Sequence, residues 1–202
     1  MTVASHLAHA ASLKASAPDG LARLADSTCM HAPLATHAWR RLVRVFKVPH
    51  GERPNPLYLR RDPRNRFDPP GGGFRVLYAA FHLDVCLAEV LSRRSTESAA
   101  DANRMADARY FVGELFPAKP LRVVDLTKLH LLDPQAADAM DALRHSQAFS
   151  EAVHRLMPHA DGMIYRSTRS RRSAAWVLAV FERGIERAGL RTRSVVPLPI
   201  GP

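Results

Sequence analysis

The sequence predicts a single α+β domain with a bent or split mixed sheet and helices around it. Strand-length apolar runs and helical segments follow one another without the regular strand–helix–strand alternation of a parallel α/β sheet. The chain has 202 residues, 47% of them hydrophobic, which is enough for one domain with a substantial core. Residues 1–36 show helical spacing and are expected to form a helical or partly ordered lead-in, and residues 37–202 the domain proper.

The elements of the domain are predicted from local patterns. A long proline-rich loop over 49–70 comes first, because prolines at this density exclude regular structure. A hairpin-like turn is expected where Pro-Ala-Lys-Pro separates two apolar runs. Asp84 is typical of a helix start, and Asp-Pro opens a later helix. The predicted strands cover 71–81, 108–116, 119–129, 160–168, 174–182 and 193–200, and the predicted helices cover 84–94, 133–145 and 146–157.

One acidic residue, Glu89, lies in the middle of the apolar helix predicted over 84–94. An exposed ion pair with Arg93 at i+4 would explain it without any function. A carboxylate at the edge of the apolar stripe could instead point into a cleft. Spacing alone leaves both interpretations open.

The charge of the chain suggests that it binds anions. The formal net charge is +10, and arginine supplies most of the 29 basic residues. Such arginine groups suit polyphosphate, an acidic partner protein or nucleic acid. A basic nucleic-acid-binding module is therefore the alternative from another functional class, although the chain has no helix-turn-helix, zinc-finger or RRM-like motif. The groups are Arg40, Arg41 and Arg44; Arg60, Arg61, Arg64 and Arg66; and Arg166, Arg169, Arg171 and Arg172.

Several site classes are disfavoured by the motifs. The run Gly71–Gly73 precedes a strand and fits neither GxGxxG nor a P-loop. Ser167 does not lie in GxSxG, which argues against a hydrolase triad. Two cysteines and scattered histidines predict no metal site. No apolar run spans a membrane, and the N-terminus lacks a signal-peptide pattern. We therefore expect a cytoplasmic protein.

Taken together, five stretches of the sequence resemble the RES domain family. They are "RLVRVF", "RF" before a glycine-rich turn, "VLYAAFHLDVCLAEVL", "DGMIYRSTRS" and "WVLAVFE". The likeness covers roughly residues 39–182, and the block from Tyr78 to Glu89 is its most specific part. The "RF" region is proline-rich here, where many members have a Gly-Gly-Arg-Trp turn. The family's arginine therefore corresponds to either Arg66 or Arg44.

The resemblance implies a toxin of a bacterial toxin–antitoxin pair with an ADP-ribosyltransferase-like fold and NAD as its substrate. Residues 37–202 would then be the NAD-binding catalytic domain, needing no metal. Members of the family hydrolyse or phosphorolyse NAD, or transfer ADP-ribose to a protein. The usual partner is an Xre-like antitoxin that blocks the active site. A nuclease toxin is a weaker alternative, since no His/Lys/Glu constellation specifies one.

The residues supply the chemistry that NAD cleavage needs. Breaking the nicotinamide–ribose bond develops a cation that a carboxylate, here Glu89, can stabilise. Arg44 and Arg66 are expected to hold the pyrophosphate, with Tyr78 stacking on nicotinamide or ribose and Ser167 bonding to the amide or ribose. Glu89, Tyr78 and Arg66 are thus the catalytic candidates. Among the acceptors, transfer to a host protein is slightly favoured over water or phosphate, because positive surface could dock a target.

Overall fold

The structure is a computed structural model that describes residues 34–59, 65–94, 109–127 and 139–198. Its strands are β1 (Leu34–His37), β2 (Leu42–Val48), β3 (Val76–Ala80), β4 (Arg109–Pro117), β5 (Leu121–Asp125), β6 (Gly162–Arg166), β7 (Trp176–Phe181) and β8 (Leu190–Leu198); its helices are α3 (Leu83–Arg94), α5 (Ala139–Leu156) and α6 (Glu182–Ala188). The lead-in expected over 1–36 lies outside the described residues as far as position 33, and β1 begins at the next residue.

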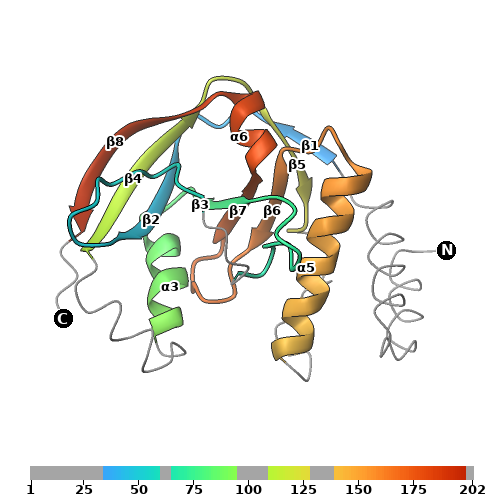
Figure 1. Ribbon diagram of the computed structural model, residues 1–202, viewed down its shortest axis with the longest axis horizontal. Helices are drawn as coiled ribbons and strands as arrows, with labels where there is room; N and C mark the ends of the chain where they lie inside the picture. Colours follow the sequence, from blue (N-terminus) through green and yellow to red (C-terminus); the bar gives the residue numbers. More distant parts are fainter. Residues whose placement is uncertain (1–33, 60–64, 95–108, 128–138, 199–202) are drawn as a thin grey trace.

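The eight strands form one strongly bent sheet in the order β1-β5-β6-β7-β3-β2-β4-β8 (Figure 1). All neighbours pair antiparallel except β5 and β6, which are parallel, so the sheet is mixed. The predicted fold class, a single α+β domain with a bent mixed sheet, is confirmed.

The sheet is weakest between β2 and β3. These two strands are joined by one paired position, Val43 with Ala80, whereas β2 and β4 are paired along seven positions. Helix α3 packs across this joint and touches β2, β3 and β7. The sheet is therefore nearly split at this point, and α3 packs against the strands on both sides of the joint.

Two cores lie on the two faces of the sheet. The first lies beneath α3 and α5 and includes Val85, Phe149 and Phe181; we call this side the α3/α5 face. The second lies beneath α6 and includes Leu77 and Leu178; we call this side the α6 face. Because successive strand residues point to opposite faces, Leu77 and its neighbour Tyr78 are on different sides.

Most predicted elements are present, but two predictions are wrong. β4 and β5 do not form a hairpin, because β2 and β8 occupy both edges of β4 while β1 and β6 occupy both edges of β5. The linker between them instead bonds to the end of α6, where Ala118 N donates to Gly189 O. The two helices expected over 133–157 are one continuous helix from residue 139, because Ser146 is buried in its interior rather than capping a new helix.

Three elements were missed by the sequence patterns, namely β1, β2 and α6. The last is only seven residues long, too short for a periodicity signal. Its end is marked by Gly189, which adopts the left-handed conformation typical of a helix C-terminus. Within the parts of the chain that the structure describes, no helix combines the length and the apolar character needed to cross a bilayer.

Candidate functional site

Glu89 and Ser167 meet on the α3/α5 face. Glu89 is half-buried in the middle of α3, and Ser167, only 3% exposed, follows β6 directly. The Ser167 hydroxyl donates a 2.6 Å hydrogen bond to Glu89 Oε1 and accepts one from the backbone N–H of Arg169. Two residues that are 78 positions apart in the sequence are therefore joined through their side chains.

The loop that follows Ser167 is fixed at several points. The Ser167 N–H donates to Ala175 O at 2.6 Å, which closes the base of the loop. Near its tip, Arg172 forms a 3.0 Å ion pair with Asp84 in the first turn of α3. The hydrogen bond from Arg172 lowers the pKa of the Asp84 carboxyl below its usual value. The same loop therefore contacts both the start of α3 and, through Ser167, its middle.

A short turn, residues 65–68, lies on the same face and is held by Tyr78 of β3. The Tyr78 hydroxyl donates to Asp68 Oδ1 and accepts from the N–H of Phe67, both at 3.0 Å. Asp68 Oδ2 accepts from the backbone N–H and the side-chain amide of Asn65. From α5, Ser150 donates a 2.7 Å bond to Phe67 O. Burial, followed by the neighbouring Asp68, raises the pKa of Tyr78 well above its usual value, so its hydroxyl stays protonated and can donate.

Arg66 lies in this turn between Asn65 and Phe67. Its half-buried side chain has no hydrogen bond or ion pair within the described part of the chain. The Phe67 ring packs edge-on against Tyr165 of β6, with ring centres 4.9 Å apart. Tyr165 is two residues before Ser167, and both residues are buried. The turn that carries Arg66 is thus packed beside the end of β6, where Ser167 meets Glu89.

Arg44 is not brought to this cluster. It lies in β2 between Val43 and Val45, whose side chains belong to the core of the α3/α5 face. Because successive strand residues point to opposite faces, the Arg44 side chain projects from the other face. There its guanidinium donates a 2.6 Å hydrogen bond to Pro56 O and lies 5.8 Å from the Phe46 ring centre. Burial lowers the pKa of Arg44 to about 10. These contacts hold the loop around Pro56 against the sheet.

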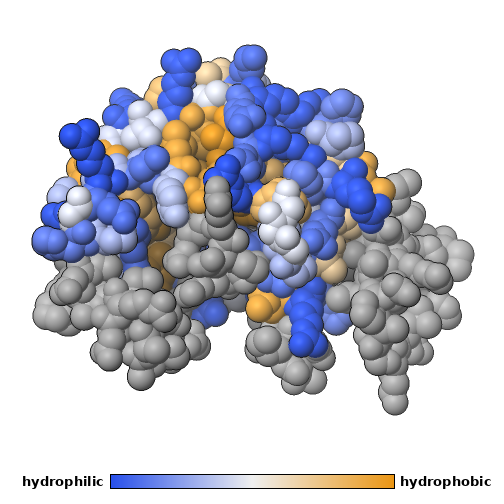
Figure 2. Space-filling view, in the orientation of Figure 1, coloured by the Kyte–Doolittle hydropathy of each residue, from blue (hydrophilic) through white to orange (hydrophobic). Residues whose placement is uncertain are grey.

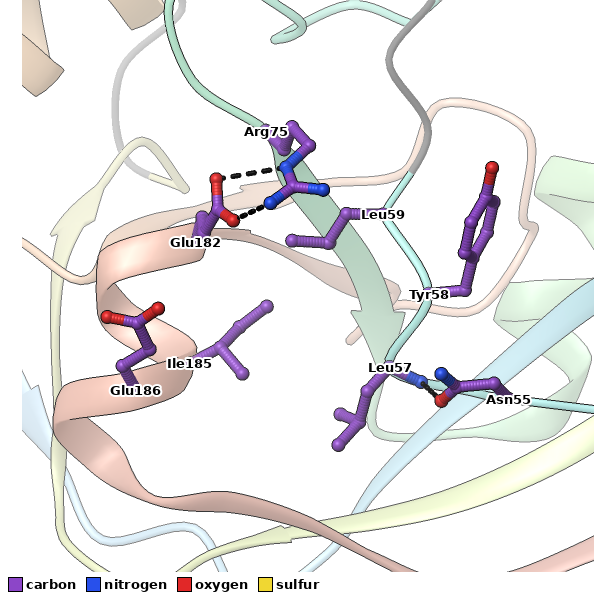
Figure 3. Close-up of a pocket in the computed structure, with 8 residues that line it drawn as sticks. All are labelled: Asn55, Leu57, Tyr58, Leu59, Arg75, Glu182, Ile185 and Glu186. Atoms are coloured by element: carbon purple, nitrogen blue, oxygen red, sulfur yellow. Dashed lines mark hydrogen bonds and ion pairs between the residues drawn. The ribbon is translucent and has the colours of Figure 1, made fainter.

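A separate pocket of about 300 Å³ lies on the α6 face (Figure 3). Its wall contains the two-pronged ion pair between Arg75 and Glu182, which Figure 3 shows at the start of α6. Figure 2 shows an apolar area beside α6 with hydrophilic side chains around it. None of the residues predicted from the sequence lines this pocket, whose walls are Asn55, Leu57, Tyr58, Leu59, Arg75, Glu182, Ile185 and Glu186. We therefore take the Glu89–Ser167 cluster, rather than the pocket, as the candidate site.

The sequence interpretation named Glu89, Ser167, Tyr78 and Arg66, and the structure brings all four to one face. The alternative partner of Glu89, Arg93, has a side chain outside the described part of the chain. Asp68 was missed. Its signal was the Asn-x-x-Asp spacing in "NRFD", which is typical of a turn closed by an acidic side chain. Among the residues with described positions, no three His, Cys, Asp or Glu side chains gather to form a metal site.

Comparisons with known proteins identify the family of this chain. Residues 37–199 match the model of the RES domain. The fold is similar to a chain in the crystal structure of the M. tuberculosis MbcT–MbcA toxin–antitoxin complex, with 19% identity, a TM-score of 0.56, and coverage of 89% of this chain and 92% of that one. No curated protein matches the chain. Because the family model spans most of the sequence, the resemblance inferred from its motifs is confirmed, and the chain belongs to the RES domain family.

Proposed function

We propose that this protein is the toxin of a toxin–antitoxin pair and that it cleaves the nicotinamide–ribose bond of NAD. The observation that carries the proposal is the hydrogen bond between Ser167 and Glu89, with the turn of Arg66 packed beside it. Membership of the RES domain family and the similarity to a chain of a toxin–antitoxin complex support it.

In the proposed reaction, the bond between the nicotinamide nitrogen and the ribose anomeric carbon breaks and its electron pair leaves with neutral nicotinamide. The ribose then carries an oxocarbenium-like positive charge, as in glycoside cleavage. The Glu89 carboxylate stabilises this charge, and such preorganised groups are typically worth about 3–4 kcal/mol. Ser167 fixes the orientation of the carboxylate through its 2.6 Å bond.

The pyrophosphate of NAD requires a cationic donor, and Arg66 is the candidate on this face. Its guanidinium has no hydrogen bond or ion pair to another described residue, so it can give its donors to phosphate oxygens in a forked arrangement. Arg44, the other arginine considered from the sequence, is engaged by Pro56 O on the opposite face. We therefore assign phosphate binding to Arg66. A stacking role for the Tyr78 ring stays a prediction, since its hydroxyl is committed to the turn.

The ribosyl cation can be captured by water, by phosphate or by a nucleophilic side chain. We favour transfer of ADP-ribose to a host protein, as in a mono-ADP-ribosyltransferase. Arg169 and Arg171 follow Ser167 within four residues and would offer positive charge to an acidic target beside the reacting centre, whereas Arg172 is paired with Asp84. A glycohydrolase or phosphorylase that depletes NAD would need no such docking surface.

A partner is required because a cytoplasmic enzyme that consumes NAD would harm its own cell. We propose a small Xre-like antitoxin whose acidic terminal segment occupies the phosphate position. From the sequence, either Arg44 or Arg66 is expected to contact this segment. Arg66 is favoured because it lies on the face of the candidate site. Burying an arginine without a counter-charge is costly, so a carboxylate in that place would bind tightly. Co-expression with the neighbouring open reading frame should restore growth, and a tailless antitoxin that still inhibits fully would contradict this model.

The function is tested by incubating the purified chain with NAD labelled in the adenosine half. Release of nicotinamide measures bond cleavage. Label recovered as free ADP-ribose identifies hydrolysis, and label recovered as the phosphate ester of ADP-ribose identifies phosphorolysis. Label recovered on protein from a host lysate identifies transfer. Nicotinamide release at the uncatalysed rate, from protein shown to be folded, would refute the proposed reaction.

A further inference from the structure

The four-residue turn over 65–68 is fixed by hydrogen bonds from within the turn and from two neighbouring elements, β3 and α5. Asp68 N donates to Asn65 O at 3.1 Å, which closes the turn itself. Gln147 of α5 donates a 3.2 Å bond to the same carbonyl. The two polar backbone atoms of Phe67 are bound by Tyr78 and Ser150. Contacts from β3 and α5 therefore fix the backbone on both sides of Arg66.

Asp68 is the centre of this network. The residue is only 7% exposed, and its carboxylate accepts hydrogen bonds of 2.7, 2.8 and 3.0 Å from other described residues. Two come from Asn65, before Arg66, and one comes from Tyr78, whose oxygen in turn accepts from Phe67, after Arg66. One carboxylate thus links both neighbours of Arg66.

We infer that Asp68 is a positioning residue for NAD binding, which acts by holding the turn in the conformation that directs the Arg66 guanidinium toward the pyrophosphate. This inference rests on the proposed function. A long arginine side chain loses much rotamer freedom when it binds, so a rigid base limits the additional ordering that binding requires. Functional groups held by packed, hydrogen-bonded supports lose affinity when those supports are removed.

Deleting the carboxylate separates this role from a purely structural one. We expect Asp68→Ala to raise the KM for NAD about tenfold, with a smaller effect on kcat, because phosphate binding rather than bond breaking is disturbed. Asp68→Asn keeps one acceptor oxygen, and its KM should lie between those of Asp68→Ala and wild type. If the alanine variant does not fold, the asparagine variant still measures the effect.

A double-mutant cycle with Arg66 gives the decisive readout. If Asp68 acts through Arg66, removing it matters little once the guanidinium is gone. The KM of Arg66→Ala/Asp68→Ala should then stay within about twofold of that of Arg66→Ala alone, instead of showing the product of the two effects. Independent, multiplicative effects on KM would overturn the inference.

Asp161 provides a matched control. It is also buried, at 1% exposed, and accepts bonds from a backbone N–H and from a side chain, those of Arg122 and Arg187, but at the junction of β5, β6 and α6. We expect Asp161→Ala to lower thermal stability at least as much as Asp68→Ala while leaving the KM for NAD unchanged.

The outcomes distinguish the inference from the proposed function. Wild-type protein that cleaves NAD, together with an Asp68→Ala variant of unchanged KM, would overturn the inference alone. Equal rises in KM for Asp68→Ala and Asp161→Ala would also overturn it, since loss of stability would then explain both. A folded wild-type protein that neither cleaves NAD nor binds ADP-ribose in calorimetry would overturn the proposed function and the inference with it.

Discussion

The candidate site and the surroundings of α6 use their acidic residues differently. On the α6 face, Glu182 and Asp161 form ion pairs with Arg75 and Arg187, and these pairs fasten α6 to the sheet. On the α3/α5 face, Glu89 accepts from the Ser167 hydroxyl and Asp68 accepts from hydroxyl and amide groups. The Ser167 hydroxyl orients the Glu89 carboxylate without neutralising it, whereas the arginine partners of Glu182 and Asp161 offset much of their negative charge.

This comparison explains why the pocket on the α6 face is not the candidate site. The pocket on the α6 face has an ion pair in its wall, which suits a structural joint. The α3/α5 face combines the partly buried acid, the serine and an arginine that has no hydrogen bond or ion pair to another described residue. The chemical nature of the side chains therefore separates the two faces.

The largest effect is expected at Glu89. Glu89→Gln keeps the shape of the side chain but removes its charge, so nicotinamide release should fall about 100-fold or more without a change in fold. Glu182→Gln makes the same substitution on the other face. It should keep full activity and unfold at a slightly lower denaturant concentration, since its ion pair is partly exposed. Equal activity losses in the two variants would break the comparison.

The two arginines should differ next. Arg66→Ala removes the proposed phosphate donor and should raise the KM for NAD by about 10–100-fold. Arg44→Ala removes the bond to Pro56 O on the α6 face, and we expect a lower melting temperature with the KM unchanged. Steady-state kinetics and thermal unfolding of both variants measure this. A raised KM in Arg44→Ala with wild-type behaviour in Arg66→Ala would reverse the assignment.

A smaller loss is expected at Ser167. Ser167→Ala removes the donor to Glu89 and the acceptor for the Arg169 N–H, leaving the carboxylate in place but less firmly oriented. We expect kcat to fall about tenfold, as for the loss of one hydrogen bond to a charged group. Ser167→Thr retains the hydroxyl and should recover part of the activity in the same nicotinamide assay. No recovery by threonine, in protein of normal stability, would argue that the hydroxyl is not the active feature.

The smallest effect concerns stability on the α3/α5 face, away from the reacting groups. His154 of α5 stacks on Phe74 with ring centres 4.0 Å apart, and burial lowers its pKa to about 4 from an ordinary 6.5. As the pH falls from 6.5 to 4, the unfolded chain takes up the proton before the folded one, so folding stability decreases across that window. His154→Phe keeps the stacking and removes the titration. The free energy of unfolding, measured in urea, should fall between pH 7 and pH 4.5 by about 1–2 kcal/mol less in this variant than in the wild type. An equal fall in both proteins would refute this prediction.

The sequence alone determined the α+β class, most strands and the identity of the candidate groups. Glu89 was conspicuous because a helix with Leu87, Val90 and Leu91 around it leaves little solvated surface for an acid. The motif blocks around Tyr78 and Ser167 pointed to the family. The fold class and the family were predicted correctly because they rest on local spacing and short motifs, which are properties of the chain itself.

Only the tertiary structure decided which of these groups meet. The 2.6 Å bond between Glu89 and Ser167 spans 78 positions, and the faces of Arg44 and Arg66 depend on how the strands and the loop fold over the sheet. The absent β4–β5 hairpin has the same origin, because strand neighbours are chosen by which edges remain free. The role of Asp68 became visible only when Tyr78 and Ser150 were found around the turn. Local patterns fix the direction of the backbone over a few residues, whereas contacts between distant segments depend on the packing of the whole domain.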